Sequence, residues 1–92
     1  MSIQWLFDVI EERKTNPHEG SYTSSLFQEG LPRIAQKVGE EATEVVVAAL
    51  AQDDQRLIEE AADLAYHTLV LLSARGLTPE HVLAELEKRH RR

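Results

Sequence analysis

The spacing of the apolar residues is the feature that most restricts how this chain can fold. Apolar side chains recur at every third or fourth position through most of the sequence, which places them on one face of an α-helix. Nowhere do apolar and polar residues alternate over the length of a β-strand. The pattern therefore predicts an all-α chain, divided into helices by its prolines and glycines.

The first half of the chain predicts one helix, a loop and a second helix. The apolar residues of the first helix, over residues 2–15, are Ile3, Leu6, Phe7 and Ile10. Residues 16–30 have no sustained period and are rich in Gly, Ser, Thr and Asn, so we expect a loop there. Pro32 suits the first turn of the second helix, over residues 31–51. One side of that helix then carries Ile34, Val38, Ala42, Val45, Val46 and Ala49.

The second half predicts two further helices. Asp53 and Asp54 are good N-caps for a helix over residues 54–75, and Gly76 is a good C-terminal stop. Thr78 and Pro79 then start a fourth helix. Because the connection around residue 53 is short, the second and third helices should form an antiparallel hairpin. We therefore expect a single all-α domain over residues 1–92, with four helices around a central hairpin.

The small size of the chain bears on its oligomeric state. A domain of 92 residues buries only about 60 to 65% of its unfolded surface. No cysteine is present to cross-link so small a core, and no Cys and His pattern indicates a structural zinc. We therefore expect a homodimer or a higher homo-oligomer.

Charge and hydropathy limit the partners and the compartment. The N-terminal segment has no basic region ahead of its apolar residues, unlike a signal peptide. The longest apolar stretch is far shorter than the ~20 residues of a membrane span. A net charge of −6 argues against binding to nucleic acid or to an anionic membrane. With no cysteine, the chain is typical of a soluble, cytoplasmic protein.

The acidic residues of the two central helices are the strongest chemical signal in the sequence. On the second helix, Glu40, Glu41 and Glu44 are spaced to project from one side, which we expect to face away from the apolar stripe. On the third helix, Glu60 and Asp63 repeat the three-residue spacing. In an antiparallel hairpin, the two groups of carboxylates can meet.

The surroundings of Asp63 favour a bound cation. Residues 61–72 are apolar nearly all the way round the helix, which is typical of a buried helix and would bury Asp63 with it. An unpaired buried carboxylate is costly and several together repel, so they either take up protons or hold a cation. The alternative is that Glu40, Glu41, Glu44 and Glu60 are ordinary solvated positions.

The kind of metal follows from a ligand set made only of oxygen. Asp63 stands where a histidine would complete the Glu-x-x-His pattern of a di-iron site, and no cysteine is present. Mg²⁺ is therefore favoured, with Mn²⁺ as a substitute. Because Mg²⁺ usually binds through a few carboxylates together with substrate phosphates, we expect a phosphate ester or anhydride as substrate.

Three further features have more than one interpretation. Lys37, one turn before Glu41, can form an ion pair with it or reach a substrate phosphate. His67, one turn after Asp63, can be a ligand, a base or a hydrogen-bonded core residue. The hydroxyls of the expected loop can bind phosphate or ribose oxygens, although ordinary loops look the same. They belong to Ser21, Tyr22, Thr23, Ser24 and Ser25.

Three segments resemble a known family when they are taken together and in order: SYTSSLFQEG, KVGEEATE and EEAADLAYH. They are similar to the phosphoribosyl-ATP pyrophosphohydrolases of histidine biosynthesis, and the resemblance covers essentially the whole chain. The Glu-Glu-x-x-Glu and Glu-x-x-Asp patterns also resemble the wider superfamily of all-α nucleotide pyrophosphohydrolases, which bind Mg²⁺ through them. The resemblance implies hydrolysis of phosphoribosyl-ATP to phosphoribosyl-AMP and pyrophosphate, the second step of that pathway.

The resemblance also implies roles for individual residues. The implied metal ligands are Glu41, Glu44, Glu60 and Asp63, and the catalytic carboxylates are Glu40, Glu41 and Glu44. Glu40 would hold a second ion, orient water or take its proton. Lys37 would contact phosphate, and the segment from Ser21 to Ser25 would cover the substrate. Arg33 stands where lysine is expected, which leaves its role open.

Other functions stay open beside this one. A housecleaning enzyme that destroys aberrant nucleoside triphosphates would use the same carboxylates, and a non-catalytic helical dimerisation module would carry solvated acids and no metal. Members of the resembled family are often fused to a cyclohydrolase domain, for which 92 residues leave no room. We therefore expect the following step of the pathway in another protein.

Overall fold

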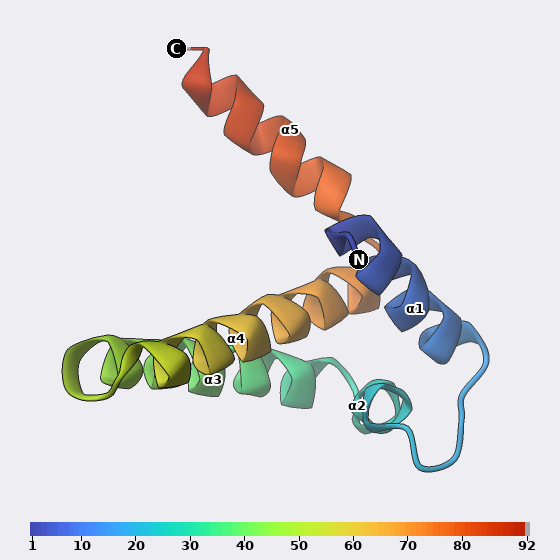
Figure 1. Cartoon of the computed structure of the whole chain (residues 1–92). Helices are drawn as coiled ribbons and strands as arrows, with labels where there is room; N and C mark the ends of the chain where they lie inside the picture. The colour runs from blue at the N-terminus through green and yellow to red at the C-terminus, as the bar shows by residue number, and fades with distance from the viewer. Residues whose placement is uncertain (92) are drawn as a thin grey trace.

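The computed structural model of the chain describes residues 1–91, and over that range it contains five α-helices and no β-strand (Figure 1). Their bounds are Ile3–Thr15 (α1), Tyr22–Glu29 (α2), Leu31–Ala51 (α3), Asp54–Ala74 (α4) and Pro79–His90 (α5). The all-α class and the four expected helices are confirmed. The loop expected over residues 16–30 is wrong in part, because that segment contains α2, and the helices number five rather than four.

Local capping explains α2, the helix that periodicity does not reveal. The Ser21 side chain accepts a hydrogen bond from the Ser24 backbone N–H, which caps the first turn. Gly30, at φ 96°, ends the helix in a backbone conformation that other residues rarely adopt. Leu26 and Phe27 are the two residues of this helix that pack in the hydrophobic core, and two apolar residues are too few to show an apolar period.

The two longest helices, α3 and α4, lie side by side as the expected antiparallel hairpin (Figure 1). The turn between them is short, and Asp53 caps α4 by accepting a hydrogen bond from the Arg56 backbone N–H at 2.9 Å. The hairpin brings the second half of α3 next to the first half of α4. Those two stretches carry six of the seven acidic residues of α3 and α4.

The core lies at the open end of the hairpin, where α1 and α2 pack against it (Figure 1). Its buried residues are Phe7, Ile10, Leu26, Ile34, Leu69 and Val70. The tip of the hairpin projects beyond this cluster, and α5 projects in another direction with its residues from 80 onward exposed. The tip of the hairpin and α5 thus both extend away from a small core, and most of their surface is uncovered in the single chain.

The expectation that α4 is a buried helix is wrong for the single chain. Ala61, Ala62, Asp63 and Ala65 are exposed, and Ile58 keeps 61% of its surface accessible. The physical reason is that α3 and α1 cover only part of the circumference of α4. Over residues 1–91, no helix combines the length and the apolar character that a membrane span requires.

Candidate metal centre

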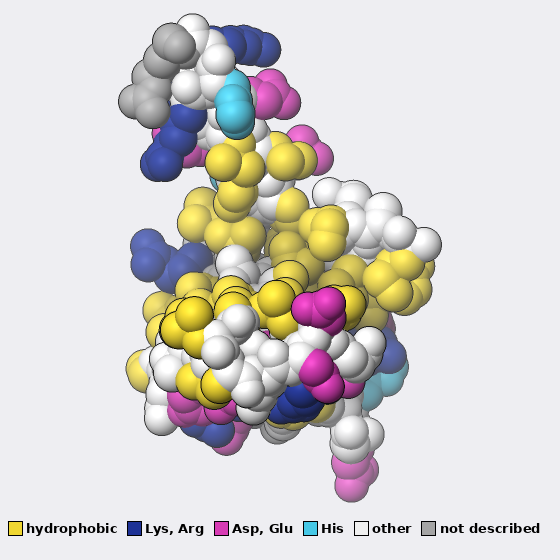
Figure 2. Space-filling model, turned by 60° about the vertical axis from the view of Figure 1, so that its left-hand side comes forward, with side chains coloured by type: hydrophobic (Ala, Val, Ile, Leu, Met, Phe, Trp, Pro, Cys, Tyr) yellow, Lys and Arg dark blue, Asp and Glu magenta, His cyan; other side chains and the backbone are white. Residues whose placement is uncertain are grey.

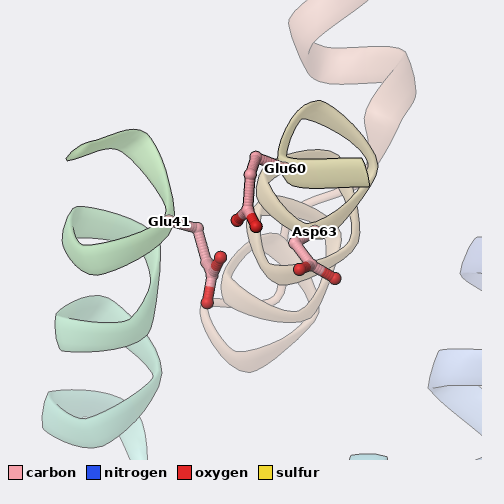
Figure 3. Close-up of side chains that lie close together, drawn as sticks. All are labelled: Glu41, Glu60 and Asp63. Carbon is pink, nitrogen blue, oxygen red and sulfur yellow. The ribbon is translucent and has the colours of Figure 1, made fainter. Parts of the chain in front are cut away.

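Three carboxylates from the two hairpin helices converge (Figure 3). Glu41 projects from α3 toward Glu60 and Asp63 on α4, and one carboxylate oxygen of each lies within 4.8 Å of the others. The predicted meeting of the two acidic groups is confirmed for these three residues. Glu41 and Glu60 are buried, whereas Asp63 is exposed and opens the cluster to solvent.

Two details of the predicted orientation are wrong. Glu41 does not point away from the apolar side of its helix, because it lies seven residues from both Ile34 and Ala48 and shares their inward face. Asp63 is exposed rather than buried, since that part of α4 is not covered. The acids that carry the cost of burial are therefore Glu41 and Glu60.

Each buried carboxylate has a basic partner one turn earlier on its own helix. Lys37 Nζ lies 3.3 Å from Oε1 of Glu41, and Arg56 Nη2 lies 2.8 Å from Oε1 of Glu60. The structure thus shows the ion-pair interpretation of Lys37, and its contact with phosphate stays a prediction. Sequence reasoning missed Arg56, although its four-residue spacing to Glu60 was a visible signal.

The electrostatics of the cluster disfavour negative charge at its centre. Burial raises the pKa of Glu60, and the charges of Glu44, Asp63 and Glu41 raise it further, against the opposing effect of Arg56. For Lys37, burial acts to lower the pKa, but the bond to Glu41 and the nearby acidic groups outweigh it and raise the value. The centre therefore attracts positive charge.

The donor set fits a hard divalent cation. Ligands on opposite sides of Mg²⁺ at ~2.1 Å stand about 4.2 Å apart, so oxygens within 4.8 Å of one another need only small side-chain movements to surround it. A cation among them would also relieve the repulsion that raises the pKa of Glu60. The exposed side at Asp63 leaves room for further ligands from solvent or substrate.

Comparison with known proteins decides the family. Residues 4–90 match the family described as phosphoribosyl-ATP pyrophosphohydrolase. The chain belongs to this family. Three proteins named phosphoribosyl-ATP pyrophosphatase illustrate the similarity. The protein of Lacticaseibacillus casei is 53% identical over 96% of this chain and 80% of its own length. That of Clostridium botulinum is 48% identical over 98% and 82%, and that of Sulfurisphaera tokodaii 51% identical over 95% and 93%.

The remaining acids of the phosphoribosyl-ATP pyrophosphohydrolase motif, Glu40 and Glu44, lie outside the group of three. Both are exposed. Glu40 is paired with Lys37 at 3.7 Å and with Arg33 at 3.6 Å, which gives Arg33 a partner in this structure. The charge of Glu44 raises the pKa values of both Glu60 and Arg56, so the Glu44 side chain lies beside the cluster. Their roles as ligand or catalytic group stay predictions.

The predicted substrate-covering segment forms the first turns of α2, and its hydroxyls are bonded within the protein. Ser21 caps the helix, Ser25 donates to the Tyr22 carbonyl oxygen, and Ser24 is buried between the His18 N–H and the Arg13 carbonyl. Three residues of the segment, Ser21, Tyr22 and Ser25, also line a cavity of about 570 Å³. The rest of its lining is Pro17, His18, Glu19, Gly20 and Gln28. Thr23 and Ser24 face the protein instead.

His67 is the hydrogen-bonded core residue among the interpretations that the sequence allowed. Its side chain is buried, and both ring nitrogens have partners within the protein: Tyr22 OH at 2.9 Å and the Asp63 carbonyl oxygen at 2.7 Å. Neither nitrogen is turned toward the three carboxylates as a ligand. In this member of the family, His67 therefore connects α4 to α2.

Proposed function

We propose that this chain hydrolyses phosphoribosyl-ATP to phosphoribosyl-AMP and pyrophosphate in a Mg²⁺-dependent reaction of histidine biosynthesis. The observation that carries the proposal is the convergence of Glu41 with Glu60 and Asp63 in a member of this family. A triphosphate carries several negative charges, which these acids would repel without a cation between them. Metal and substrate would thus bind to one centre.

The residues that would hold the cation are Glu41, Glu60 and Asp63, with Glu44 beside them. When bound, Mg²⁺, or Mn²⁺ in its place, neutralises the triphosphate and favours attack by water. Lys37 stands at the edge of the cluster, 3.3 Å from Glu41, with only 19% of its side chain exposed. There its ammonium group would bind phosphate oxygens and orient them toward the centre.

A carboxylate beside the cluster would take the proton of the attacking water. Glu40 would have to leave its pairs with Lys37 and Arg33 to do so. The charge of Glu44 already raises the pKa of Glu60, so Glu44 lies beside the cluster without any rearrangement. We therefore place the proton acceptor among these two residues. A comparison of the Glu40→Gln and Glu44→Gln variants separates them, because only loss of the acceptor changes the dependence of kcat on pH.

The test measures pyrophosphate release from phosphoribosyl-ATP and from a panel of nucleoside triphosphates, with Mg²⁺ present. The Asp63→Asn variant removes a ligand charge and keeps the side-chain volume, so we expect a loss of at least ~100-fold in kcat/KM, about 2.7 kcal/mol of transition-state stabilisation. Glu59→Gln is the matched control, since Glu59 is an exposed neighbour of Glu60 that pairs with Arg56 outside the cluster. Its activity should be retained.

Other results would favour the other functions. Preferential release from ordinary nucleoside triphosphates would favour a housecleaning enzyme with the same carboxylates. No release from any substrate, together with no binding of Mg²⁺ or Mn²⁺ in calorimetric titrations, would favour a dimerisation module. Full activity in Asp63→Asn would contradict the metal assignment whichever substrate is used.

We also propose that the chain forms a homodimer through α4. Five apolar residues share one side of this helix, within about 40° of its centre at 100° per residue: Ile58, Ala61, Ala65, Leu69 and Leu72. We call them the α4 apolar face. Ile58, Ala61 and Ala65 are exposed in the single chain, whereas Leu69 already belongs to its core and Leu72 packs against that core. From Ala65 onward, the face continues into an apolar groove of about 380 Å³ bordered by Ile3 and the first turn of α5. Figure 2 shows hydrophobic side chains gathered over the hairpin and toward α5.

The pattern of the α4 apolar face favours a second copy of this chain as its partner. Successive members are spaced by three, four, four and three residues, so the order of the spacings is the same in both directions along the helix. In an antiparallel pair of α4 helices, Ala65 would meet its own copy at the two-fold axis, and Ile58 would meet Leu72 of the partner subunit. Glu60 and Asp63 lie on the opposite side of α4, so this contact would leave the cluster open.

A further inference from the structure

Two polar bonds join the beginning of α2 to α4. The Tyr22 hydroxyl lies 2.9 Å from Nε2 of His67, and the Thr23 hydroxyl bonds to the hydroxyl of Tyr66. The rings also pack together, with Tyr22 and Tyr66 stacked at 6.2 Å between centroids and His67 edge-on to both. Otherwise α2 packs mainly on α1 and α3. Adjacent residues of α2 therefore bond to adjacent residues of α4.

The direction of the bond between Tyr22 and His67 follows from the other nitrogen. His67 Nδ1 is 2.7 Å from the carbonyl oxygen of Asp63, which can only accept, so Nδ1 carries a hydrogen. In the neutral ring, Nε2 is then an acceptor, and the Tyr22 hydroxyl donates to it. The bond thus links Tyr22, through one imidazole, to the backbone of a residue in the carboxylate cluster.

Tyr22 stands between two parts of the candidate site. Half of its surface is exposed, and it lines the cavity beside α2. Tyr22 also lies close enough to Lys37 to help raise the pKa of that ammonium, although burial acts to lower this pKa and Glu41 contributes more to raising it. A substrate that extends from the carboxylates past Lys37 would therefore meet Tyr22 next.

We propose that His67 is a positioning residue, which acts on the substrate through Tyr22. This inference rests on the proposed function, because it requires a substrate that extends from the cluster to α2. A Tyr22 hydroxyl that donates to His67 cannot donate to a phosphate at the same time. What Tyr22 offers a nucleotide is its aromatic face, on which a base can stack. The hydrogen bond between Tyr22 and His67 fixes the orientation of that face and the position of the start of α2 relative to α4.

The kinetic test removes the bond from either end. Tyr22→Phe keeps the ring and His67→Leu removes the acceptor, and each should raise KM for phosphoribosyl-ATP roughly two- to ten-fold, the net value of one hydrogen bond, with kcat unchanged. The double variant should be no worse than either single variant, because both changes break one bond. His67→Gln, whose amide oxygen can accept from Tyr22, should recover most of the affinity.

The control variant removes a hydroxyl that takes no part in the bond between Tyr22 and His67. Thr43→Val deletes the hydroxyl of an exposed α3 residue, bonded only to the Gly39 carbonyl of its own helix, and should leave KM unchanged. A fall of kcat in Tyr22→Phe that His67→Leu does not share would show that the hydroxyl of Tyr22 acts on the substrate directly. Additive effects in the double variant would mean the same, and either result would overturn the proposal.

A spectroscopic measurement tests the bond without turnover. In protein with ¹⁵N-labelled histidine, NMR should show one imidazole protonated at Nδ1 only, and its Nε2 resonance should shift in Tyr22→Phe because it loses a hydrogen bond. Protonation at Nε2 alone, or a resonance that does not move, would overturn the positioning role. Wild-type protein that leaves phosphoribosyl-ATP intact would refute the proposed function instead, while the NMR result would still decide on the bond.

Discussion

Replacement of Ile58 by alanine should separate the proposed dimer into subunits without unfolding them. Ile58 lies near the tip of the hairpin and exposes 61% of its surface in the single chain. Because the subunit already buries the other 39% of Ile58, its truncation should destabilise the isolated subunit by about 0.6–1.2 kcal/mol, too little to unfold it. A large effect on assembly would therefore report contacts that only a partner provides.

The size of that effect follows from the exposed fraction. Complete burial of an isoleucine side chain contributes about 1.5–3 kcal/mol, and a partner can supply at most the 61% that the subunit leaves exposed, roughly 0.9–1.8 kcal/mol. A two-fold dimer contains the residue twice, so the loss is about 2–4 kcal/mol. The dissociation constant should then rise roughly 30- to 700-fold.

Sedimentation velocity over a series of protein concentrations measures this change directly. Gln55→Ala is the matched control, since it shortens a side chain of the same helix that lies off the α4 apolar face, and its dissociation constant should stay at the wild-type value. Ala65→Glu should prevent dimerisation altogether, because it would bring two like charges together at the axis. A monomeric wild-type protein at every concentration, or an unchanged constant in Ile58→Ala, would refute the proposed contact.

Three further results are expected. Without divalent cations, Glu60→Gln should raise the melting temperature at neutral pH. Because the pKa of Glu60 is higher in the folded protein than its ordinary value of 4.5, the folded state loses stability as the pH rises above 4.5, and glutamine avoids this loss. Thermal scans with EDTA and then with Mg²⁺ should show that Mg²⁺ stabilises the wild type but not this variant. Lys37→Met should raise KM for phosphoribosyl-ATP about ten-fold in steady-state assays if its ammonium binds phosphate. Leu26→Ala should cost about 2–5 kcal/mol in urea unfolding, since Leu26 is 1% exposed and anchors α2 in the core; a change below 1 kcal/mol would contradict that anchoring role.

Periodicity and capping residues were enough to predict the long helices. The expected helix over residues 31–51 matches α3, and the one over residues 54–75 ends within one residue of α4. The helix α2 escaped this reasoning because a short helix held by a serine cap and two apolar residues leaves no period to detect. Helices are thus predictable where many residues repeat one spacing, and not where a single cap decides.

The candidate site shows a similar division. The three- and four-residue spacings placed Glu41, Glu60 and Asp63 close to one another, which the structure confirms. Which of them is buried depended on how far the helices cover one another, and local spacing does not contain that information. The same holds for the bond between Tyr22 and His67, since it joins residues 45 positions apart. Partners so distant in sequence are fixed only by the packing of whole helices.

The all-round apolar character of α4 has a different meaning from the one that its sequence first suggests. Such a helix is expected in the centre of a large core, but a chain of 92 residues has no core of that size. Its two sides instead serve two separate requirements. One side carries Glu60, Asp63 and His67 toward α3 and α2, and the other carries the α4 apolar face. A rotation of the helix that also covered Ile58, Ala61 and Ala65 within the subunit would turn the carboxylates away from Glu41. Assembly with a second chain would satisfy both sides, and this is why we expect catalysis and the proposed dimerisation to depend on the same helix.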